Sequence, residues 1–475
     1  MKNILKILAL LFGTFLIVSG CDDYTELTPP AINTGSVDFS NFVAIGNSLT
    51  AGYQSGSLFE SAQVYSFGKQ IANEMNVNFE QPLVGDPGTI GRLEVKSLSP
   101  FTLYNDPNSG VPKNLNYPMP YNNLGVPGAL LYDVLNATNS SNCASALFAN
   151  SPNPMFDLIL RNSALNLGTQ LQQVAALKPT FITLWIGNND ILGYATSGGV
   201  SPSTPTELTT FTYLYNILGT TVASLGAKVV VANIPDVTTI PFFTTVGPQM
   251  AMGIPWYQLA ALQVPGLFYQ QHEETGPASV YADSSTLRNF GVLLTLKGSS
   301  YAGLVGTPGG KFYRDFGYSG LPAGIDTTKP FGIHPQNPWP DVLILDPGEI
   351  TTAVTTTNSY NSVISDVANA NGFGLVDINS YLKGFLAGKV VNGIKFSTIF
   401  VQGNLFSLDG VHPTSRGQGL IANEFIKIIN SKFGASLRLI DVSTIPGSLD
   451  FAGKINYDKH GYVIFPAGAF DHLFF

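Results

Sequence analysis

Charge is scarce in this chain of 475 residues: Asp, Glu, Lys and Arg together make up 11%, against roughly 25% in an average soluble protein. The formal net charge is −8. Binding to nucleic acid requires a basic face that displaces counterions from phosphate, so this balance argues against a nucleic-acid partner. The solvated surface must therefore consist largely of uncharged polar residues. Hydrophobic residues make up 44% of the chain, which is enough for a large core.

Cysteine and histidine are also rare, which limits the metal sites that the chain could form. The two cysteines are Cys21 and Cys143, and neither a His-Glu-x-x-His run nor a paired-cysteine motif indicates a zinc site. Four of the five histidines lack the spacing of metal ligands and are interpreted as surface or structural residues: His272, His334, His460 and His472.

The N-terminus has the pattern of an export signal. Two lysines and an apolar run over residues 7–18, too short to span a bilayer comfortably, precede Cys21. The last residues of this segment, Val-Ser-Gly-Cys, resemble the lipobox of bacterial lipoproteins. The resemblance implies cleavage before Cys21, its acylation, and a stable anchor in the cell envelope, at the periplasmic face or the outer surface. The alternative is a plain secretory signal that a cysteine happens to follow.

This interpretation sets the N-terminal organisation of the chain. Residues 1–20 are the expected lipoprotein signal peptide, and residues 21–36, which include Pro29-Pro30, the expected tether. With Cys21 acylated, Cys143 is left without a partner, so an intrachain disulfide is not expected.

Apolar β-type runs alternate with longer helical patterns, which predicts an α/β fold with a parallel sheet. The expected strands cover residues 42–45, 181–186, 228–232 and 374–378. The expected helices cover residues 163–177 and 349–370, and a third follows Pro413, which suits a first helical turn.

Two stretches interrupt this alternation, at about residues 78–120 and 241–345. Both are rich in Gly and Pro, and the second also in aromatics, without a sustained period. We interpret them as insertions over the sheet that determine substrate specificity, because long loops of α/β enzymes lie at the carboxyl ends of strands. A small cap domain at 241–345 stays an alternative. Residues 436–475 form a C-terminal extension.

Four short segments carry residues suited to catalysis. Gly46-Asn47-Ser48-Leu49 follows a predicted strand, where a serine hydroxyl can project from the sheet edge. An ordinary turn is the alternative. The run from Gly187 to Asp190 follows another strand, and its side-chain amides could donate to an oxyanion or simply cap the next helix.

The other two segments supply a base and a backbone donor. In Asp409-Gly-Val-His412 the spacing of three lets the carboxylate reach the imidazole, fix its tautomer and stabilise the imidazolium. The segment from Asn123 to Gly128 could offer an unhindered glycine N–H, although alone it is indistinguishable from a loop turn. Asp236, which follows a strand, is interpreted as a capping residue rather than a site residue.

In this order, the four segments resemble the hallmark blocks of the SGNH/GDSL hydrolase family: Gly-Asp-Ser-Leu, Asn-x-x-x-x-Gly, Gly-x-Asn-Asp and Asp-x-x-His. The resemblance implies a three-layer α/β/α sandwich with a flavodoxin-like parallel sheet, here over residues 37–435. It also implies that the catalytic residues are Ser48, Asp409 and His412, and that the oxyanion hole combines the N–H groups of Ser48 and Gly128 with the Asn189 amide. One departure is Asn47, where the family has Asp; we expect a modest effect because the nucleophile is intact.

The resemblance implies a serine esterase that needs neither a metal nor an organic cofactor. Its substrate would be a small-molecule, glycan or lipid ester, and its link to the membrane the N-terminal lipid. Two substrate classes stay open, a lipase or short-chain acylhydrolase and a glycan O-deacetylase. The alternative from another class is a non-catalytic, glycan-binding surface lipoprotein on a hydrolase scaffold.

Overall fold

The computed structural model describes residues 32–98, 101–447, 468 and 470–474. The expectations for the signal peptide and for Cys21 therefore lie outside the described residues. The chain divides into Met1–Asn33 and Thr34–Phe475, and all described helices and strands belong to the second unit. No helix among the described residues is both long and apolar enough to cross a membrane.

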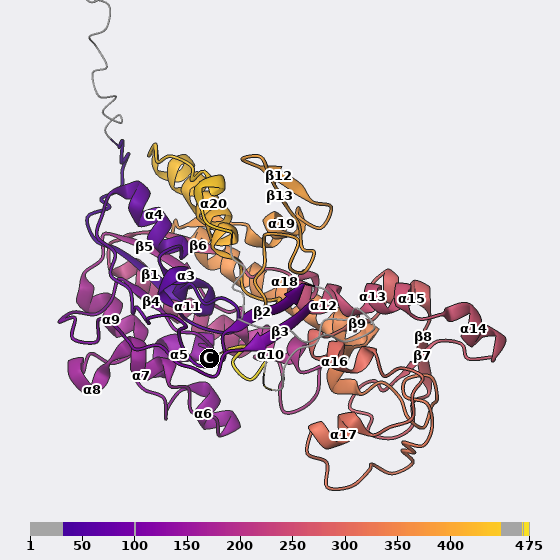
Figure 1. Ribbon diagram of the computed structural model, residues 1–475. Coiled ribbons are helices and arrows are strands. Elements are labelled where there is room, and N and C mark those ends of the chain that lie inside the picture. The colour runs from indigo at the N-terminus through magenta and orange to yellow at the C-terminus, as the bar shows by residue number, and fades with distance from the viewer. Residues whose placement is uncertain (1–31, 99–100, 448–467, 469, 475) are drawn as a thin grey trace, which may run out of the picture. The chain divides into compact units, whose positions relative to one another are not determined.

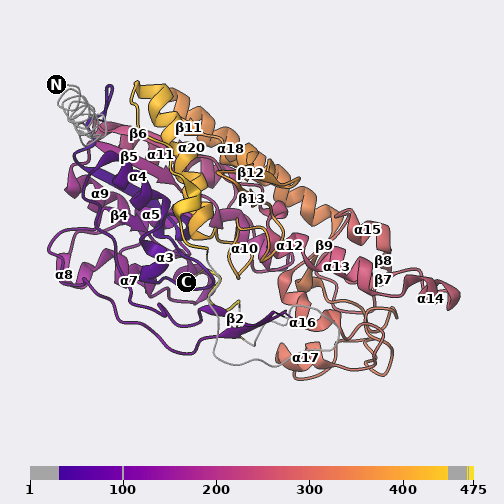
Figure 2. The same cartoon turned by 45° about the horizontal axis from the view of Figure 1, so that its top comes forward.

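The core of the fold is a parallel sheet whose strands lie in the order β11-β6-β5-β1-β4; Figure 1 labels β1, β4, β5 and β6, and Figure 2 labels β11. The strands are β1 (Phe42–Gly46), β4 (Asn123–Gly125), β5 (Phe181–Trp185), β6 (Lys228–Ala232) and β11 (Gly374–Val376). Gly46 is in register with both Trp185 and Gly125, so three strands end at the same level. Every residue of β1 and β5 is buried, as expected for parallel strands covered on both faces.

Helices cover both faces of the sheet, which confirms the predicted three-layer α/β/α architecture. One face carries α4 (Phe67–Met75) and α20 (Ser415–Phe433), and the other carries α5 (Leu131–Asn136), α9 (Gln170–Leu177), α11 (Leu208–Ser224) and α18 (Pro347–Ala370). On the first face, the rings of Phe67 and Phe425 stack with centroids 4.8 Å apart. On the second face, the rings of Phe211 in α11 and Tyr360 in α18 stack with their centroids 3.9 Å apart.

The strand order creates a crevice at one point of the sheet edge. From β1 the chain first adds β4 on one side and then β5, β6 and β11 on the other. In such flavodoxin-like sheets, ligands bind outside the carboxyl ends of the strands where the order reverses, which here is between β1 and β5. The topology therefore directs attention to the residues that follow Gly46 and Trp185.

The two insertions have defined structure of their own. The first contains an antiparallel hairpin, β2 (Leu93–Leu98) and β3 (Phe101–Asn105). The second gathers on one side of the sheet in Figures 1 and 2, and its buried side chains join the same hydrophobic cluster as the strands. Its elements are α12 (Pro241–Thr244), α13 (Val246–Gly253), α14 (Trp256–Ala261), β7 (Leu267–Tyr269), β8 (Val280–Ala282), α15 (Ser284–Arg288), β9 (Leu293–Leu294), α16 (Ser299–Ala302), α17 (Lys311–Asp315) and β10 (Ile344–Leu345).

Shorter elements complete the described chain. The helices are α2 (Ser48–Ala51), α3 (Glu60–Gln63), α6 (Ala144–Ala149), α7 (Met155–Leu160), α8 (Asn162–Leu165), α10 (Asn189–Thr196) and α19 (Ile378–Lys383). The strands β12 (Lys389–Val391) and β13 (Ile394–Phe396) pair as a hairpin, and the 3-10 turns are η1 (Val237–Thr239), η2 (Leu296–Gly298), η3 (Asp341–Leu343) and η4 (Val442–Thr444).

The expected helix over residues 163–177 is wrong as a single element, because the chain breaks between α8 and α9. Gly168 has φ of 83°, in the left-handed region that favours glycine. Thr169 then starts a new helix with a capping box: its Oγ1 accepts from the Gln172 N–H at 3.3 Å, and the Gln172 side chain accepts from the Thr169 N–H at 2.8 Å.

Other elements also differ from expectation, and some of the differences have similar local reasons. Pro413 lies outside α20, because the side chain of Thr414 accepts from the Gly417 N–H at 3.0 Å and is the N-cap. The strand expected over residues 374–378 ends at Val376, since Asp377 caps α19. The segment that begins at Asn123, which by itself was indistinguishable from a loop turn, contributes the edge strand β4.

Two glycine-to-alanine changes test how tightly the sheet edge is packed. A Cβ on Gly46 would collide with the Thr50 hydroxyl and the Trp185 carbonyl oxygen, whereas a Cβ on Gly193, inside α10, meets no atom within 4 Å. We expect Gly46→Ala to lower the free energy of unfolding by about 2–3 kcal/mol. Gly193→Ala should raise it by about 0.5–1 kcal/mol because alanine favours helix. Denaturant unfolding measures both; equal effects would contradict the packing described for Gly46.

Candidate active site

Ser48 is the first residue of α2, directly after the turn that ends β1 at the strand-order reversal. Asn47 is the N-cap of α2, and its side-chain oxygen accepts from the Leu49 N–H at 3.1 Å. Gly52 ends this short helix with φ of 79°. The tight turn places Ser48 at the carboxyl edge of the sheet with 4% of its surface exposed.

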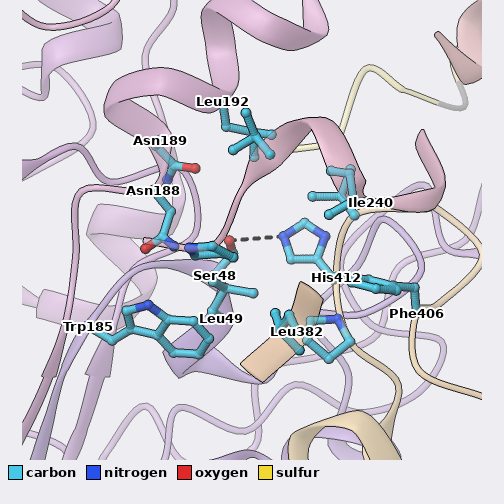
Figure 3. A pocket seen from close by; sticks show the side chains of 14 residues that line it. Ser48, Leu49, Trp185, Asn188, Asn189, Leu192, Ile240, Leu382, Phe406 and His412 are labelled. Carbon is cyan, nitrogen blue, oxygen red and sulfur yellow. Dashed lines mark hydrogen bonds between the residues drawn. The ribbon is translucent and has the colours of Figure 1, made fainter. Parts of the chain in front are cut away.

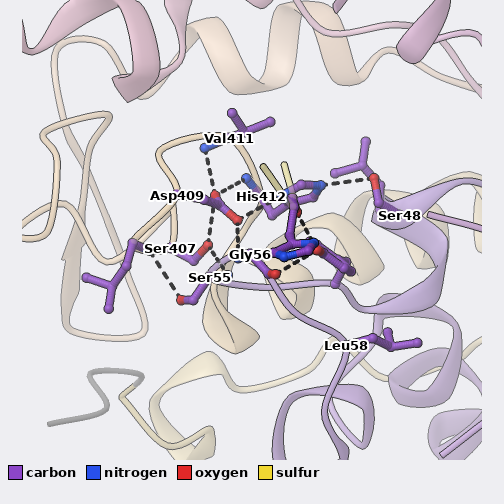
Figure 4. Close-up of polar contacts among 12 residues, drawn as sticks. Ser48, Ser55, Gly56, Leu58, Ser407, Asp409, Val411 and His412 are labelled. Atoms are coloured by element: carbon purple, nitrogen blue, oxygen red, sulfur yellow. Dashed lines mark hydrogen bonds and ion pairs between the residues drawn. The ribbon is translucent and has the colours of Figure 1, made fainter. Parts of the chain in front are cut away.

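Ser48, His412 and Asp409 form a continuous hydrogen-bonded chain (Figures 3 and 4). The distance from Ser48 Oγ to His412 Nε2 is 2.9 Å, and that from His412 Nδ1 to Asp409 Oδ2 is also 2.9 Å. Both distances suit proton transfer from a hydroxyl to an imidazole that a carboxylate orients. The fold thus brings together three sequence-predicted residues, two of which lie more than 350 positions after Ser48.

Asp409 is fully buried, and all of its partners donate hydrogen bonds (Figure 4). Its Oδ1 accepts from the N–H groups of Val411 and His412, each at 2.9 Å, and from Ser407 Oγ at 3.1 Å. Its Oδ2 accepts from Gly56 N at 2.9 Å, besides His412 Nδ1. Burial alone raises the pKa of Asp409, but the charge of His412 and these hydrogen bonds outweigh it and hold that pKa below its ordinary value.

Residues that sequence reasoning missed fix the loop that carries Asp409. Ser407 Oγ accepts from the Ser55 N–H at 2.9 Å, and Ser55 Oγ accepts from the Leu408 N–H at 3.3 Å. The phenol ring of Tyr53 packs on the imidazole of His412 with centroids 4.9 Å apart. The only sequence signal was proximity, since Ser55 and Ser407 flank the motifs without belonging to them.

Of the predicted oxyanion donors, Asn189 lies at the same cavity as Ser48 and Gly128 does not. Asn189 is the first residue of α10, and its Nδ2 donates to the Ala129 carbonyl at 2.9 Å. Gly128 follows β4 with φ of 78°, on the loop next to Ala129, but it is not part of the described lining of the cavity.

Asn47 and Asn188 form a buried amide pair where the family has an aspartate. Asn47 keeps the cap of α2 through its oxygen, and its Nδ2 donates to Asn188 Oδ1 at 3.1 Å. A carboxylate could not make this second bond without a rotation of the Asn188 amide, whose Nδ2 is buried without a hydrogen-bond partner among the described residues. Asn188 therefore has a structural role that the motif did not indicate, because it accepts a hydrogen bond from Asn47.

The cavity at Ser48 is small and apolar (Figure 3). Its volume is about 40 Å³, which admits roughly three water molecules. Besides the polar side chains, its walls include Leu49, Trp185, Leu192, Ile240, Leu382 and Phe406. A serine and a histidine in such a place are shielded from bulk water, and His412 is only 1% exposed. Polar interactions in this cavity are stronger than at the surface.

Asp236 has the capping role that the sequence favoured. Its Oδ1 accepts from the Thr238 N–H at 3.0 Å, at the start of η1. Its Oδ2 forms an ion pair with Lys383 Nζ, 3.1 Å away. The neighbouring residues Pro235 and Val237 line the cavity instead. No group of acidic, histidine or cysteine side chains within the described ranges could hold a metal ion, and Cys143 is buried and free.

Asp190 fixes the first turn of α10, which carries Asn189. Its Oδ2 accepts from the Leu131 N–H at 2.9 Å and its Oδ1 from Thr206 Oγ1 at 2.8 Å. Complete burial raises the pKa of Asp190 to about 7, although these hydrogen bonds oppose the shift. Asp190 therefore titrates far above the usual range of an aspartate.

Comparisons with known proteins bear on this site. A family model described as GDSL-like Lipase/Acylhydrolase matches residues 42–277, a range that contains Ser48, Gly128 and Asn189 but ends before Asp409. No curated protein matches the chain. Among solved structures, the chain is similar to LAE5, an alpha/beta hydrolase enzyme from the metagenome of Lake Arreo, Spain. The two share 12% identity over 83% of this chain and 96% of that one, with a TM-score of 0.32.

The raised pKa of Asp190 predicts a pH-dependent stability. A folded-state pKa of about 7, against about 3.9 in the unfolded chain, means that the folded protein binds the extra proton. This contribution is complete below about pH 4 and is lost as pH rises through 7. Between about pH 4 and pH 7, the free energy of unfolding of the parent protein should fall by up to about 4 kcal/mol more than that of Asp190→Asn, which cannot titrate at this position.

Denaturant unfolding at several pH values between 4 and 8 measures this difference. The exposed Asp366 of α18 supplies the control, and Asp366→Asn should follow the parent protein across the whole range. Parallel pH profiles for the parent protein and Asp190→Asn would contradict the assignment.

Proposed function

We propose that this chain, which belongs to the GDSL-like lipase/acylhydrolase family, hydrolyses acyl esters with Ser48 as nucleophile, His412 as base and Asp409 as the group that orients His412. Membership of the family makes the protein a hydrolase that acts on esters. The assignment of roles to individual residues is the proposal. It is carried by one observation, the uninterrupted chain of hydrogen bonds from Ser48 Oγ through the imidazole to Asp409.

In the first half of the reaction, Ser48 Oγ attacks the ester carbonyl carbon as His412 Nε2 takes the hydroxyl proton. The negative charge that forms on the carbonyl oxygen is stabilised by hydrogen-bond donors. Asn189 Nδ2 and the Ser48 N–H group, which lie at the cavity, are the proposed donors, and the Gly128 N–H group is the third donor that the family pattern implies. When the tetrahedral species collapses, the imidazolium gives its proton to the leaving alcohol and Ser48 retains the acyl group.

In the second half, water attacks the acyl group and His412 takes a proton from that water. Collapse of this second tetrahedral species returns the proton to Ser48 Oγ and releases the carboxylic acid. Throughout, the Asp409 carboxylate accepts from Nδ1, which keeps Nε2 free as a base and stabilises the imidazolium. The lowered pKa of Asp409 keeps this carboxylate ionised at neutral pH.

A scaffold that only bound glycans would have no use for this arrangement. Binding requires neither an imidazole at 2.9 Å from a serine hydroxyl nor a carboxylate that five donors hold ionised. Both parts of the arrangement are costly, because each buries polar groups that must be paired. Retention of all three residues therefore favours catalysis over the glycan-binding alternative.

Labelling with a fluorophosphonate probe tests the nucleophile. We expect the parent protein to be labelled and Ser48→Ala not to be, with hydrolysis of p-nitrophenyl acetate falling by about 10⁴–10⁶ in Ser48→Ala or His412→Ala. Asn189→Ala should lose about 10²–10³ in turnover with labelling retained. Ser299 is a matched control, since it is buried and its hydroxyl has no partner among the described residues; Ser299→Ala should behave as the parent.

Ester hydrolysis at the parent rate by folded Ser48→Ala would remove Ser48 from the mechanism. A folded parent protein that neither reacts with the probe nor hydrolyses any ester would favour the glycan-binding alternative instead.

We propose in addition that the protein is exported and anchored in the cell envelope through acylation of Cys21. The support is the sequence Val18-Ser-Gly-Cys21 after a short apolar run. Cells fed labelled palmitate should incorporate it into the parent protein and into Cys143→Ala, but not into Cys21→Ala. Label in Cys21→Ala, or none in the parent protein, would contradict the anchor.

A further inference from the structure

A second and much larger cavity adjoins the one at Ser48. Its volume is about 1040 Å³, and none of the described residues that line it is charged. We call it the outer groove; its walls come from residues 238–252 and 290–293, from Leu386 and from residues 398–404, besides residues of the β2–β3 hairpin and of α18. The two insertions are expected to determine substrate specificity, but neither the catalytic motifs nor the family comparison says which part of a substrate these segments bind.

The outer groove begins where the wall of the small cavity ends. The turn η1 separates them: Val237 lines the small cavity, and Thr238 and Thr239 line the outer groove. Close to the end of α19, Leu382 lines the small cavity and Leu386 lines the outer groove. The two cavities therefore neighbour one another at η1 and near the end of α19, and this shared edge is where we place the part of a substrate that extends beyond the small cavity.

The outer groove lies on the His412 side of the site. The segment that follows η1 is tied to the His412 loop, since the Phe242 N–H donates to the Gly410 carbonyl at 3.0 Å. The segment 398–404 is tied to it as well, through a bond of 2.7 Å from Thr414 Oγ1 to the Asn404 carbonyl. The helices that begin at Ser48 and Asn189 contribute no described residue to the groove. Because His412 protonates the leaving alcohol, the alcohol lies on this side.

Exposed apolar side chains edge the outer groove. Met252 is 73% exposed, Ile399 60% and Leu386 49%. Single apolar side chains are common on surfaces, but several around one uncharged groove are typical of a site for an apolar ligand. The remaining polar groups of the groove are hydroxyls and amides, such as Thr238 and Asn404, which repel no uncharged ligand.

We propose that the substrate is a short-chain acyl ester, above all an acetate, of a bulky, uncharged and mainly apolar alcohol. The acyl group lies in the small cavity and the alcohol in the outer groove. A volume of about 40 Å³, the room of roughly three waters, holds an acetyl group but is too small to hold a long acyl chain within it. This inference rests on the proposed function, because it presumes that Ser48 attacks the ester and that His412 faces the alcohol.

Two isomeric esters separate this assignment from its reverse. Hexyl acetate and ethyl hexanoate have the same atoms and similar hydrophobicity, but the long chain belongs to the alcohol in the first and to the acid in the second. We expect kcat/KM to be at least tenfold higher for hexyl acetate. From ethyl to hexyl acetate, kcat/KM should rise by up to about fourfold for each added CH₂ group, the limit for full burial. Equal values, or a preference for ethyl hexanoate, would overturn the proposal.

Variants of the outer groove test where the alcohol binds. A carboxylate in the groove opposes a hydrocarbon, so Met252→Asp and Leu386→Asp should each lower the ratio of kcat/KM for hexyl acetate to that for ethyl acetate by about tenfold. Leu262→Asp is a matched control, since Leu262 is 72% exposed and outside the groove, and should leave the ratio unchanged. An unchanged ratio in both groove variants would overturn the proposal, as would higher kcat/KM on acetylated glucose than on hexyl acetate.

These results differ from a failure of the proposed function. If Ser48 reacts with a fluorophosphonate and esters are hydrolysed, but hexyl acetate is not preferred, only the substrate assignment fails. If neither isomer is hydrolysed and Ser48 does not react, both proposals fail.

Discussion

The buried carboxylate of Asp409 is the group on which the rest of the site depends. Removing a carboxylate from water costs several kcal/mol unless hydrogen bonds replace its hydration. Here five donors do so, and they come from Gly56, Ser407, Val411 and His412. Because Gly56 follows the nucleophile turn and the other donors surround Asp409 itself, the same bonds that keep the carboxylate ionised also align the two loops. The position of His412 relative to Ser48 follows from this alignment.

The side chains around Ser48 and His412 are mostly apolar. Trp185, Leu192 and Ile240 close the small cavity around a serine and a histidine that are almost fully buried. Low exposure strengthens each electrostatic interaction, but it also limits what can enter. The larger space lies next to the small cavity, in the outer groove. Helices α12 and α13, at the start of the second insertion, form one wall of this groove. In the function that we propose, the core supplies the chemistry and the insertions select the substrate.

The buried acid Asp190 has a different task from Asp409, although both aspartates lie in the short motifs that indicated the site. Asp409 accepts from five donors, one of which is the imidazole of His412, and its pKa is lowered. Asp190 accepts two hydrogen bonds and lies near Asp133, so burial dominates and raises its pKa. The same type of side chain therefore holds an imidazole in one place and the start of a helix in the other, because the number and charge of the neighbours differ.

The sequence by itself determined the features that depend on neighbouring residues. Buried runs such as Phe42–Gly46 are long enough to indicate a strand, and the spacing of three between Asp409 and His412 already predicts their contact. Local signals also predicted the α/β class, since strands and helices alternate at the correct lengths. They erred at element ends such as Pro413, where one cap hydrogen bond decides the boundary.

Only the tertiary structure decided what depends on residues far apart in the chain. The pairing of Asn47 with Asn188 joins residues 141 positions apart, and the three residues of β4 are too few to show a period. The outer groove collects side chains from segments between residues 98 and 404, none of which has a motif. Hydrophobic packing is not directional, so a sequence tells which residues are buried but not which of them meet around a cavity.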